Sequence, residues 1–195
     1  GEVTKWRPAD ANWFFDFPTS AKKTLELFEV SDLYLKSSTT FDGAIALSPK
    51  VVSDLLLVTG PIPAGKPTTT FNSANVLVEI QKIVQNGQAT EATYPKQDLR
   101  DLREKIFEKL GALPEESREN LLAMLLDWGE KKDLMVYFKN PALANFFDAY
   151  GASGAAFEMP QKFNGDYLAV VDANVGGGKS DLYVSSTVIY NGQIN

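Results

Sequence analysis

The chain has 195 residues with 44% hydrophobic and 23% charged residues, a composition typical of a globular domain with a real core. Its net charge of −6 disfavours a nucleic-acid-binding protein, whose contact surface is basic. The absence of cysteine and histidine excludes disulfides, thiol chemistry and Ser-His-Asp catalysis. Acid–base chemistry would have to use Asp, Glu, Lys or Tyr, and a metal site would use oxygen ligands, which suit magnesium or calcium.

The first half of the chain alternates helix and strand patterns. Capping hydroxyls and an apolar face predict a helix over 19–34, and an apolar run predicts a short strand over 41–48. The next helix begins at the Ser-Pro pair at 48 and ends at Gly60, followed by proline. The spacing of apolar residues predicts a further helix over 73–87. We expect the segment between these two helices to be a surface loop.

The second half begins with helical patterns and ends with strand patterns. Two helices are predicted over about 95–111 and 114–131, followed by a strand over 134–138. Asn140 as cap and Gly151 as stop bound a last helix. Two strands are predicted at the end of the chain, over 166–173 and 181–190. The sequence therefore predicts a single α/β domain over 1–195, a mixed β-sheet covered by helices in α/β/α layers.

The glycine-rich stretch "ANVGGGKSD" at 173–181 resembles a phosphate-binding loop only in part. That loop needs a glycine five residues before its Gly-Lys-Ser, and alanine stands there, at position 173. A helix must also follow the loop, so that its free N–H groups hold the phosphate, but here a strand is predicted. We therefore expect a strand–strand turn that holds no nucleotide.

An arginine pair lies on the helix predicted over 95–111. Counting 100° per residue places Arg103 within roughly 40° of the centre of the apolar stripe, and Arg100 at its edge. Lys105 falls on the opposite, solvated side. We therefore expect Arg103 to be largely buried and Lys105 not. A buried arginine needs a partner, either a carboxylate such as Asp10, Asp16 or Asp172, or a bound anion, which the guanidinium fork matches well.

Two further groups of polar residues lie among apolar ones. Asp10, Asn12 and Asp16 alternate with a run of aromatic residues near the N-terminus. These residues form either a loop pinned by its aromatic side chains, with Asx turns, or an oxygen-rich metal or substrate site. The same alternatives apply to the second group, which lies around the glycine-rich loop. That group consists of Asp172, Asn174, Lys179 and Asp181.

Three stretches resemble the bacterial family called domain of unknown function 4012. They are "DANWFFDFPTSA", "FDGAIALSPKVVSDLLLVTGPI" and "DYLAVVDANVGGGKSDLYV", which together extend along nearly the whole chain. The resemblance implies a cell-envelope protein with an extracellular domain behind an N-terminal membrane anchor. It also implies that the anchor and the upstream part of the domain precede this chain. It implies no established activity.

A more distant similarity is to the LytR-CpsA-Psr phosphotransferases, which transfer polymers from lipid pyrophosphate carriers to the cell wall. Asn12, Asp42, "LLLVTGPI", "FNSANVLVEI" and the pair Arg100 and Arg103 occur in the order of that family's motifs. The similarity implies that these arginines bind pyrophosphate. Two motifs depart from the pattern, because "EIQKIV" replaces an Arg-x-Arg, and only "RPAD" at 7–10 could replace Pro-Arg-Asp.

Two functions follow from these resemblances. The first is a non-catalytic or degenerate LytR-CpsA-Psr-like module that binds a cell-wall polymer, a polyprenyl pyrophosphate lipid or a protein. The alternative is an active phosphotransferase on a lipid-linked pyrophosphate, assisted by magnesium. Arg100 and Arg103 would then hold phosphate, and Asp10 or Asp172 would lie near the metal. The missing arginine motif favours the first function.

Overall fold

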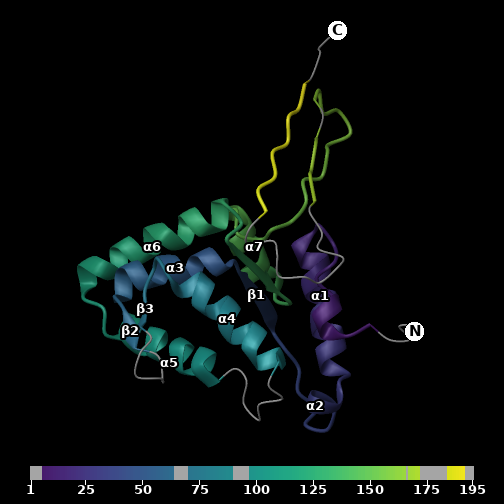
Figure 1. The fold of residues 1–195 in the computed structure, drawn as a ribbon. Coiled ribbons are helices and arrows are strands. Elements are labelled where there is room, and N and C mark those ends of the chain that lie inside the picture. The colour runs from purple at the N-terminus through teal and green to yellow at the C-terminus, as the bar shows by residue number, and fades with distance from the viewer. Residues whose placement is uncertain (1–5, 64–69, 90–96, 166, 172–183, 192–195) are drawn as a thin grey trace. The chain divides into compact units, whose positions relative to one another are not determined.

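The computed structural model describes residues 6–63, 70–89, 97–165, 167–171 and 184–191 (Figure 1). The chain divides into two units, 1–160 and 161–195, and each is described by itself. In the described residues, all helices and strands belong to the first unit. In chain order they are a 3-10 turn (Pro8–Asp10), α1 (Phe17–Glu29), α2 (Asp32–Leu35), β1 (Gly43–Leu47), α3 (Pro49–Thr59), β2 (Ile62–Pro63), β3 (Thr70–Phe71), α4 (Val76–Ala89), α5 (Gln97–Gly111), α6 (Glu115–Glu130), β4 (Leu134–Phe138) and α7 (Pro141–Ala149).

The helices of the first unit begin and end at residues that satisfy their free backbone groups. Asp16, rather than a hydroxyl of the following turn, caps α1 by accepting from the backbone N–H of Thr19 at 2.9 Å. Asn140 caps α7 in the same way, as its sequence predicts. Gly60 ends α3 with a φ of 74°, a conformation that favours glycine. The predicted helices are therefore confirmed with shifts of a few residues at their ends, except that the helix predicted over 19–34 is broken at residues 30–31 into α1 and α2.

The strands in the described residues form two small antiparallel sheets rather than one mixed sheet. β1 pairs with β4 from Gly43 opposite Phe138 to Leu47 opposite Leu134. Backbone hydrogen bonds of 2.7 Å extend this pairing at both ends, from Ser48 to Asp133 and from Lys139 to Asp42. β2 and β3 form the second pair. Both strands lie within the segment that was expected to be a surface loop, so these parts of the segment are paired. The coarse α/β class is thus confirmed.

The main hydrophobic core lies where α3, α4 and α5 meet the small sheet of β2 and β3. Its fully packed residues are Leu56, Ile62, Phe71, Val76, Leu102 and Ile106. On the other side of the unit, α1 contacts both β1 and β4, and α7 contacts β4. The core therefore lies between three helices and the β2–β3 pair, and the β1–β4 pair supplies none of its fully packed residues.

The predicted C-terminal strands are wrong for the part of them that the structure describes. Residues 167–171 and 184–190 form neither strand nor helix, and their side chains are exposed. Alternating apolar residues make a strand only when a partner strand satisfies the backbone and a core covers one face. The glycine-rich turn at 173–181 lies outside the described residues. No helix within the described ranges is long and apolar enough to cross a membrane.

Candidate functional site

The two arginines of α5 lie on its exposed side. Arg103 is 63% exposed, and its guanidinium lies 3.4 Å from the carboxylate of Glu104. The prediction that Arg103 is buried is therefore wrong. Of the carboxylates proposed as its partner, Asp10 and Asp16 contact other residues, and Asp172 lies outside the described residues. Arg100 is also exposed and forms no ion pair with the described residues. The role of either arginine in anion binding stays a prediction.

Lys105 and Lys109 explain why the helical wheel misplaces Arg103. Lys105 is half-buried and donates to the carbonyl of Pro63 at 3.2 Å. Lys109 donates at 2.9 Å to the carbonyls of Thr59 and Pro61 at the end of α3. The packed side of α5 is thus turned by roughly 70° from the centre of the apolar stripe, toward these lysines. Arg103 then lies on the side of the stripe that none of the described helices covers.

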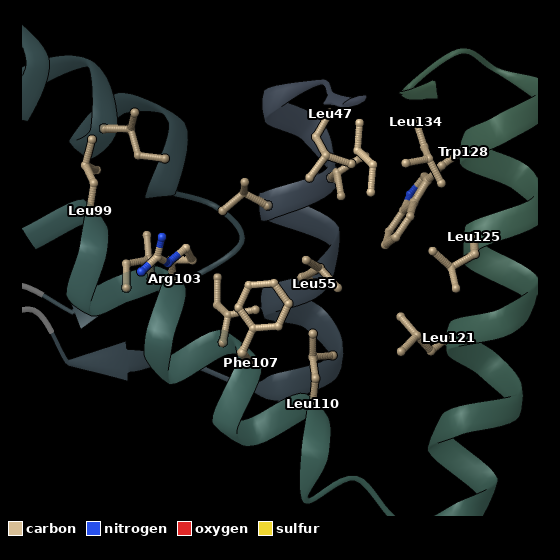
Figure 2. A pocket seen from close by; sticks show the side chains of 16 residues that line it. Leu47, Leu55, Leu99, Arg103, Phe107, Leu110, Leu121, Leu125, Trp128 and Leu134 are labelled. Atoms are coloured by element: carbon tan, nitrogen blue, oxygen red, sulfur yellow. The ribbon is translucent and has the colours of Figure 1, made fainter. Parts of the chain in front are cut away.

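An apolar groove with a volume of about 480 Å³ opens beside Arg103 (Figure 2). α5 forms one wall, α6 forms the other, and α3 lies between them as the floor. Arg103 is the only charged side chain among the sixteen described residues that line this groove. The lining consists of Ile45, Leu47, Val51, Val52, Leu55, Ile80, Leu99, Leu102, Arg103, Ile106, Phe107, Leu110, Leu121, Leu125, Trp128 and Leu134. The volume lies within the range of about 300–1,000 Å³ that small-molecule sites have.

Part of the groove lining is open to solvent. Phe107 is 67% exposed and projects from α5 between the two walls (Figure 2). Ile45 and Leu47 of β1 are also exposed, so the border of the sheet continues the apolar surface. A contiguous apolar surface that includes a concave site indicates a binding region.

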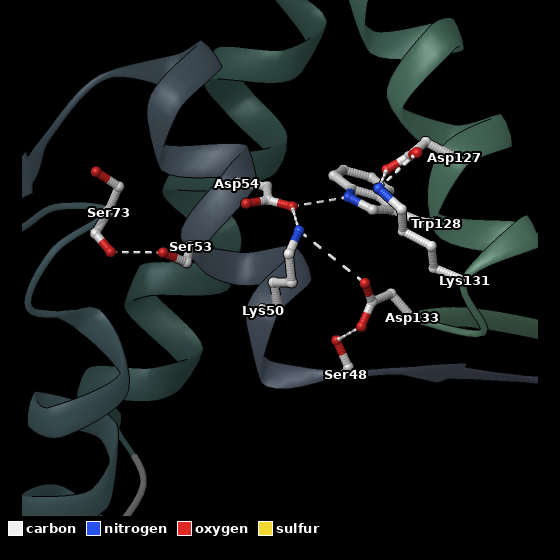
Figure 3. Close-up of polar contacts among 9 residues, drawn as sticks. All are labelled: Ser48, Lys50, Ser53, Asp54, Ser73, Asp127, Trp128, Lys131 and Asp133. Atoms are coloured by element: carbon white, nitrogen blue, oxygen red, sulfur yellow. Dashed lines mark hydrogen bonds and ion pairs between the residues drawn. The ribbon is translucent and has the colours of Figure 1, made fainter.

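A cluster of polar side chains at the start of α3 and the end of α6 holds Trp128 in place (Figure 3). This polar cluster consists of Ser48, Lys50, Asp54, Trp128 and Asp133. The indole N–H of Trp128 donates to Asp54 at 2.9 Å, so the only polar atom of that side chain is satisfied away from the groove. Lys50 pairs with the same carboxylate, and Ser48 donates to Asp133 at 2.6 Å. These contacts join the start of α3 to the end of α6 and thereby fix the distance between the floor and one wall.

The charges in this cluster stabilise one another. Burial raises the pKa of Asp54, but hydrogen bonds from Lys50 and Trp128 outweigh burial and leave that pKa below its usual value. The hydrogen bond to Asp54 raises the pKa of Lys50. Lys50 therefore stays protonated at neutral pH and is unsuited to act as a general base.

The N-terminal polar residues do not come together as a metal site. Asp10 pairs with Arg7 at 3.3 Å, and the side chain of Asn12 is exposed. Both carboxylate oxygens of Asp16 accept hydrogen bonds, one from Thr19 and the other from the backbone N–H of Ala156 at 3.0 Å. In the described part of the chain, no group of three His, Cys, Asp or Glu residues is placed to hold a metal. Asp172, Asn174, Lys179 and Asp181 lie outside the described residues.

The groove was not predicted from the sequence. The sequence feature that could have indicated the groove is the pattern of α6. Apolar residues lie on more than one face of this helix: Leu121, Leu122, Leu125 and Leu126. A helix with a wide apolar surface and only one buried large side chain, Trp128, has more apolar area than its own packing uses.

Comparison with known families places the chain in one of them. The family model described as "Protein of unknown function (DUF4012)" matches residues 1–98, which is half of the chain. The chain belongs to the DUF4012 family. Among the groove residues, those of α3, β1 and α4 lie within the DUF4012 match, and those of α5 follow it. No match was found among the curated proteins or the solved structures, and the similarity to LytR-CpsA-Psr domains stays a prediction.

Proposed function

We propose that this chain is a non-catalytic module of the cell envelope that binds an anionic lipid carrier in the apolar groove. The apolar chain of the lipid would lie between α5 and α6, and its phosphate would contact Arg103. The observation that carries the proposal is that one guanidinium stands at an otherwise wholly apolar groove. The resemblance to DUF4012 proteins supports a location on the extracellular face, behind a membrane anchor. The more distant similarity to LytR-CpsA-Psr domains supports a fold with their layers.

The chemistry of the lining favours a lipid over a polysaccharide. Sugars are bound through many hydrogen bonds, but fifteen of the sixteen lining residues are apolar. The indole N–H of Trp128 is occupied by Asp54 and offers no contact to a sugar hydroxyl. A long hydrocarbon chain gains from such a surface because each buried CH₂ group contributes about 0.8 kcal/mol.

Arg103 is free to change partners. Its present partner, Glu104, is 69% exposed, and such surface ion pairs contribute at most about 1 kcal/mol. A diphosphate at the mouth of the groove would offer the guanidinium a bidentate, charge-assisted contact, which is stronger. We limit the proposal to binding, because no carboxylate is among the described residues that line the groove, and Asp10, one of the two predicted catalytic residues, is paired with Arg7.

The test compares farnesyl diphosphate, farnesol and inorganic diphosphate, with binding measured by isothermal titration calorimetry. Farnesyl diphosphate is expected to bind most tightly, with farnesol weaker and inorganic diphosphate weakest. Arg103→Gln should weaken farnesyl diphosphate about tenfold and leave farnesol unchanged, because a charge-assisted hydrogen bond contributes about 1.5–3 kcal/mol. Because Arg103 is exposed, its replacement should change the free energy of unfolding by less than about 0.5 kcal/mol.

Two matched variants complete the experiment. Lys82→Gln removes a cation of similar exposure that pairs with Glu79 on α4 and does not line the groove, so it should leave binding unchanged. Arg100→Gln measures the contribution of the second predicted anion contact, which we expect to be smaller than that of Arg103. Equal losses in Arg103→Gln and Lys82→Gln, or no binding of either farnesyl compound at millimolar concentration, would contradict the proposal.

A further inference from the structure

A second apolar surface lies far from the groove in sequence, at the turn before α1. Trp6, Trp13, Phe14 and Phe15, here called the aromatic loop, are between 41% and 64% exposed. Trp6 and Phe14 lie 6.3 Å apart, and neither Trp13 nor Phe15 makes a ring contact within the described part of the chain. The chain has three tryptophans, and only the third, Trp128, is buried. Four large rings in ten residues thus remain in contact with water.

The backbone of this loop is fixed although its side chains are exposed. The hydroxyl of Ser20, a buried side chain, donates to the carbonyl of Phe14 at 2.9 Å and accepts from its N–H at 3.0 Å. The backbone N–H of Phe17 donates to Gly154 at 3.1 Å, and Asp16 accepts from Ala156. The loop is therefore pinned by hydrogen bonds and by Phe17. The interpretation that its aromatic side chains pin it is wrong for Trp13 and Phe15.

Each charged side chain within residues 6–17 has a partner. Arg7 and Asp10 form an ion pair at 3.3 Å, and the carboxylate of Asp16 accepts hydrogen bonds from Thr19 and Ala156. An aromatic surface flanked by such partnered charges meets the headgroup region of a bilayer without the cost of removing an unpaired charge from water. Tryptophan and phenylalanine are the side chains that favour this interfacial depth.

We propose that the aromatic loop docks on a lipid bilayer, with Trp13 and Phe15 inserted at the level of the headgroups. The hydrogen-bonded backbone supports this assignment. Because the loop is already ordered, it loses little conformational entropy when it meets the membrane. A bilayer accepts rings that protrude from a turn without needing a shaped pocket, whereas a protein hot spot seats such rings in complementary pockets. This surface is separate from the groove and does not depend on the function proposed for it.

The test uses the full chain and vesicles of phosphatidylcholine, with tryptophan emission as the readout. Wild type should show a blue shift on vesicle addition and quenching by bromine-labelled phosphatidylcholine. The double variant Trp13→Ser/Phe15→Ser should bind the vesicles at least about tenfold more weakly, because two rings no longer leave water. The single variants Trp6→Phe and Trp13→Phe keep the apolar surface and identify which indole is quenched; we expect Trp13 to carry most of the signal.

The control removes apolar area of similar exposure outside the loop. Val30→Ser/Leu33→Ser should bind vesicles as wild type does, since both residues are exposed and lie after α1 and in α2. Far-UV circular dichroism verifies that both double variants fold. Three results would overturn the proposal: no partition of wild type at millimolar lipid, equal affinity of wild type and the Trp13/Phe15 variant, or binding that requires anionic lipid and disappears in salt.

Discussion

Asp16 shows at the residue scale how one side chain in a candidate metal cluster serves the fold instead. Its carboxylate accepts from the backbone N–H and the hydroxyl of Thr19 at 2.9 and 2.5 Å, and from the backbone of Ala156 at 3.0 Å. Burial raises its pKa, but these hydrogen bonds outweigh burial and leave the pKa below the ordinary 3.8. The carboxylate therefore stabilises the folded state in its charged form.

Asp16→Ala is expected to lower the free energy of unfolding by about 1–2 kcal/mol at pH 7, the usual cost of a lost helix cap. Because the folded-state pKa lies below 3.8, the contribution of Asp16 is present above that pH and is lost as pH falls through the folded pKa. Urea unfolding at pH 7 and pH 3 should show the two proteins converging in acid. Asp10→Ala, which removes an exposed ion pair, should cost less than about 0.5 kcal/mol. A difference between wild type and Asp16→Ala that stays constant with pH would contradict this assignment.

At the scale of elements, the sequence predicted what local chemistry decides. The Ser-Pro pair at 48, Gly60, Asn140 and Gly151 act on the backbone next to them, so α3 and α7 could be placed without knowledge of their neighbours. The wheel of α5 likewise identified an apolar stripe. It could not tell which part of the stripe a neighbouring element covers, and for this reason Arg103 was expected inside the protein.

The strands needed information that lies far away in the chain. The prediction of β1 and β4 as strands rested on their apolar runs, but their pairing depends on residues about ninety positions apart. The alternating segments near the C-terminus also have a pattern typical of strands, but they form no strand in the described residues. An alternating pattern alone does not provide a second strand with which the segment can pair. The groove was missed for a related reason, since it exists only where α3, α5 and α6 come together.

The close approach of β1 to β4 gives a prediction at this scale. A Cβ atom on Gly43 would clash with the carbonyl oxygen of Tyr137, and this backbone atom belongs to the pairing itself. Gly43→Ala should therefore lower the free energy of unfolding by about 3 kcal/mol, the upper end of the cost of overpacking. Gly111→Ala is the matched control, because a Cβ atom at this end of α5 would meet nothing within 4 Å. It should be neutral or stabilising by up to about 1 kcal/mol, by helix propensity. Equal unfolding midpoints of the two variants in urea would contradict the close approach.

At the scale of the whole molecule, the first unit uses α3 in two ways. One side of this helix supplies Val51, Val52 and Leu55 to the groove, and Lys50 and Asp54 tie its first turns to the end of α6. The polar cluster and the apolar groove are thus built on the same helix. The cluster ties α6, one wall of the groove, to α3, which forms its floor.

The net charge of −6 gives the last prediction, which concerns how salt affects the proposed anionic ligand. The chain as a whole repels an anion, while Arg103 attracts it at the groove. Salt at 0.1 M screens charges beyond about 10 Å, so it weakens the long-range repulsion more than the direct contact with the guanidinium. The affinity for farnesyl diphosphate should therefore stay constant or rise between 0.05 and 0.5 M sodium chloride. In Arg103→Gln the main direct contact is lost and the repulsion has more weight, so the affinity should rise more steeply, while farnesol should bind both proteins almost independently of salt. Isothermal titration calorimetry at several salt concentrations measures these slopes. A steep fall of the wild-type affinity with salt would mean that several cations hold the phosphate, and Arg103 would then not be the main anion contact of the groove.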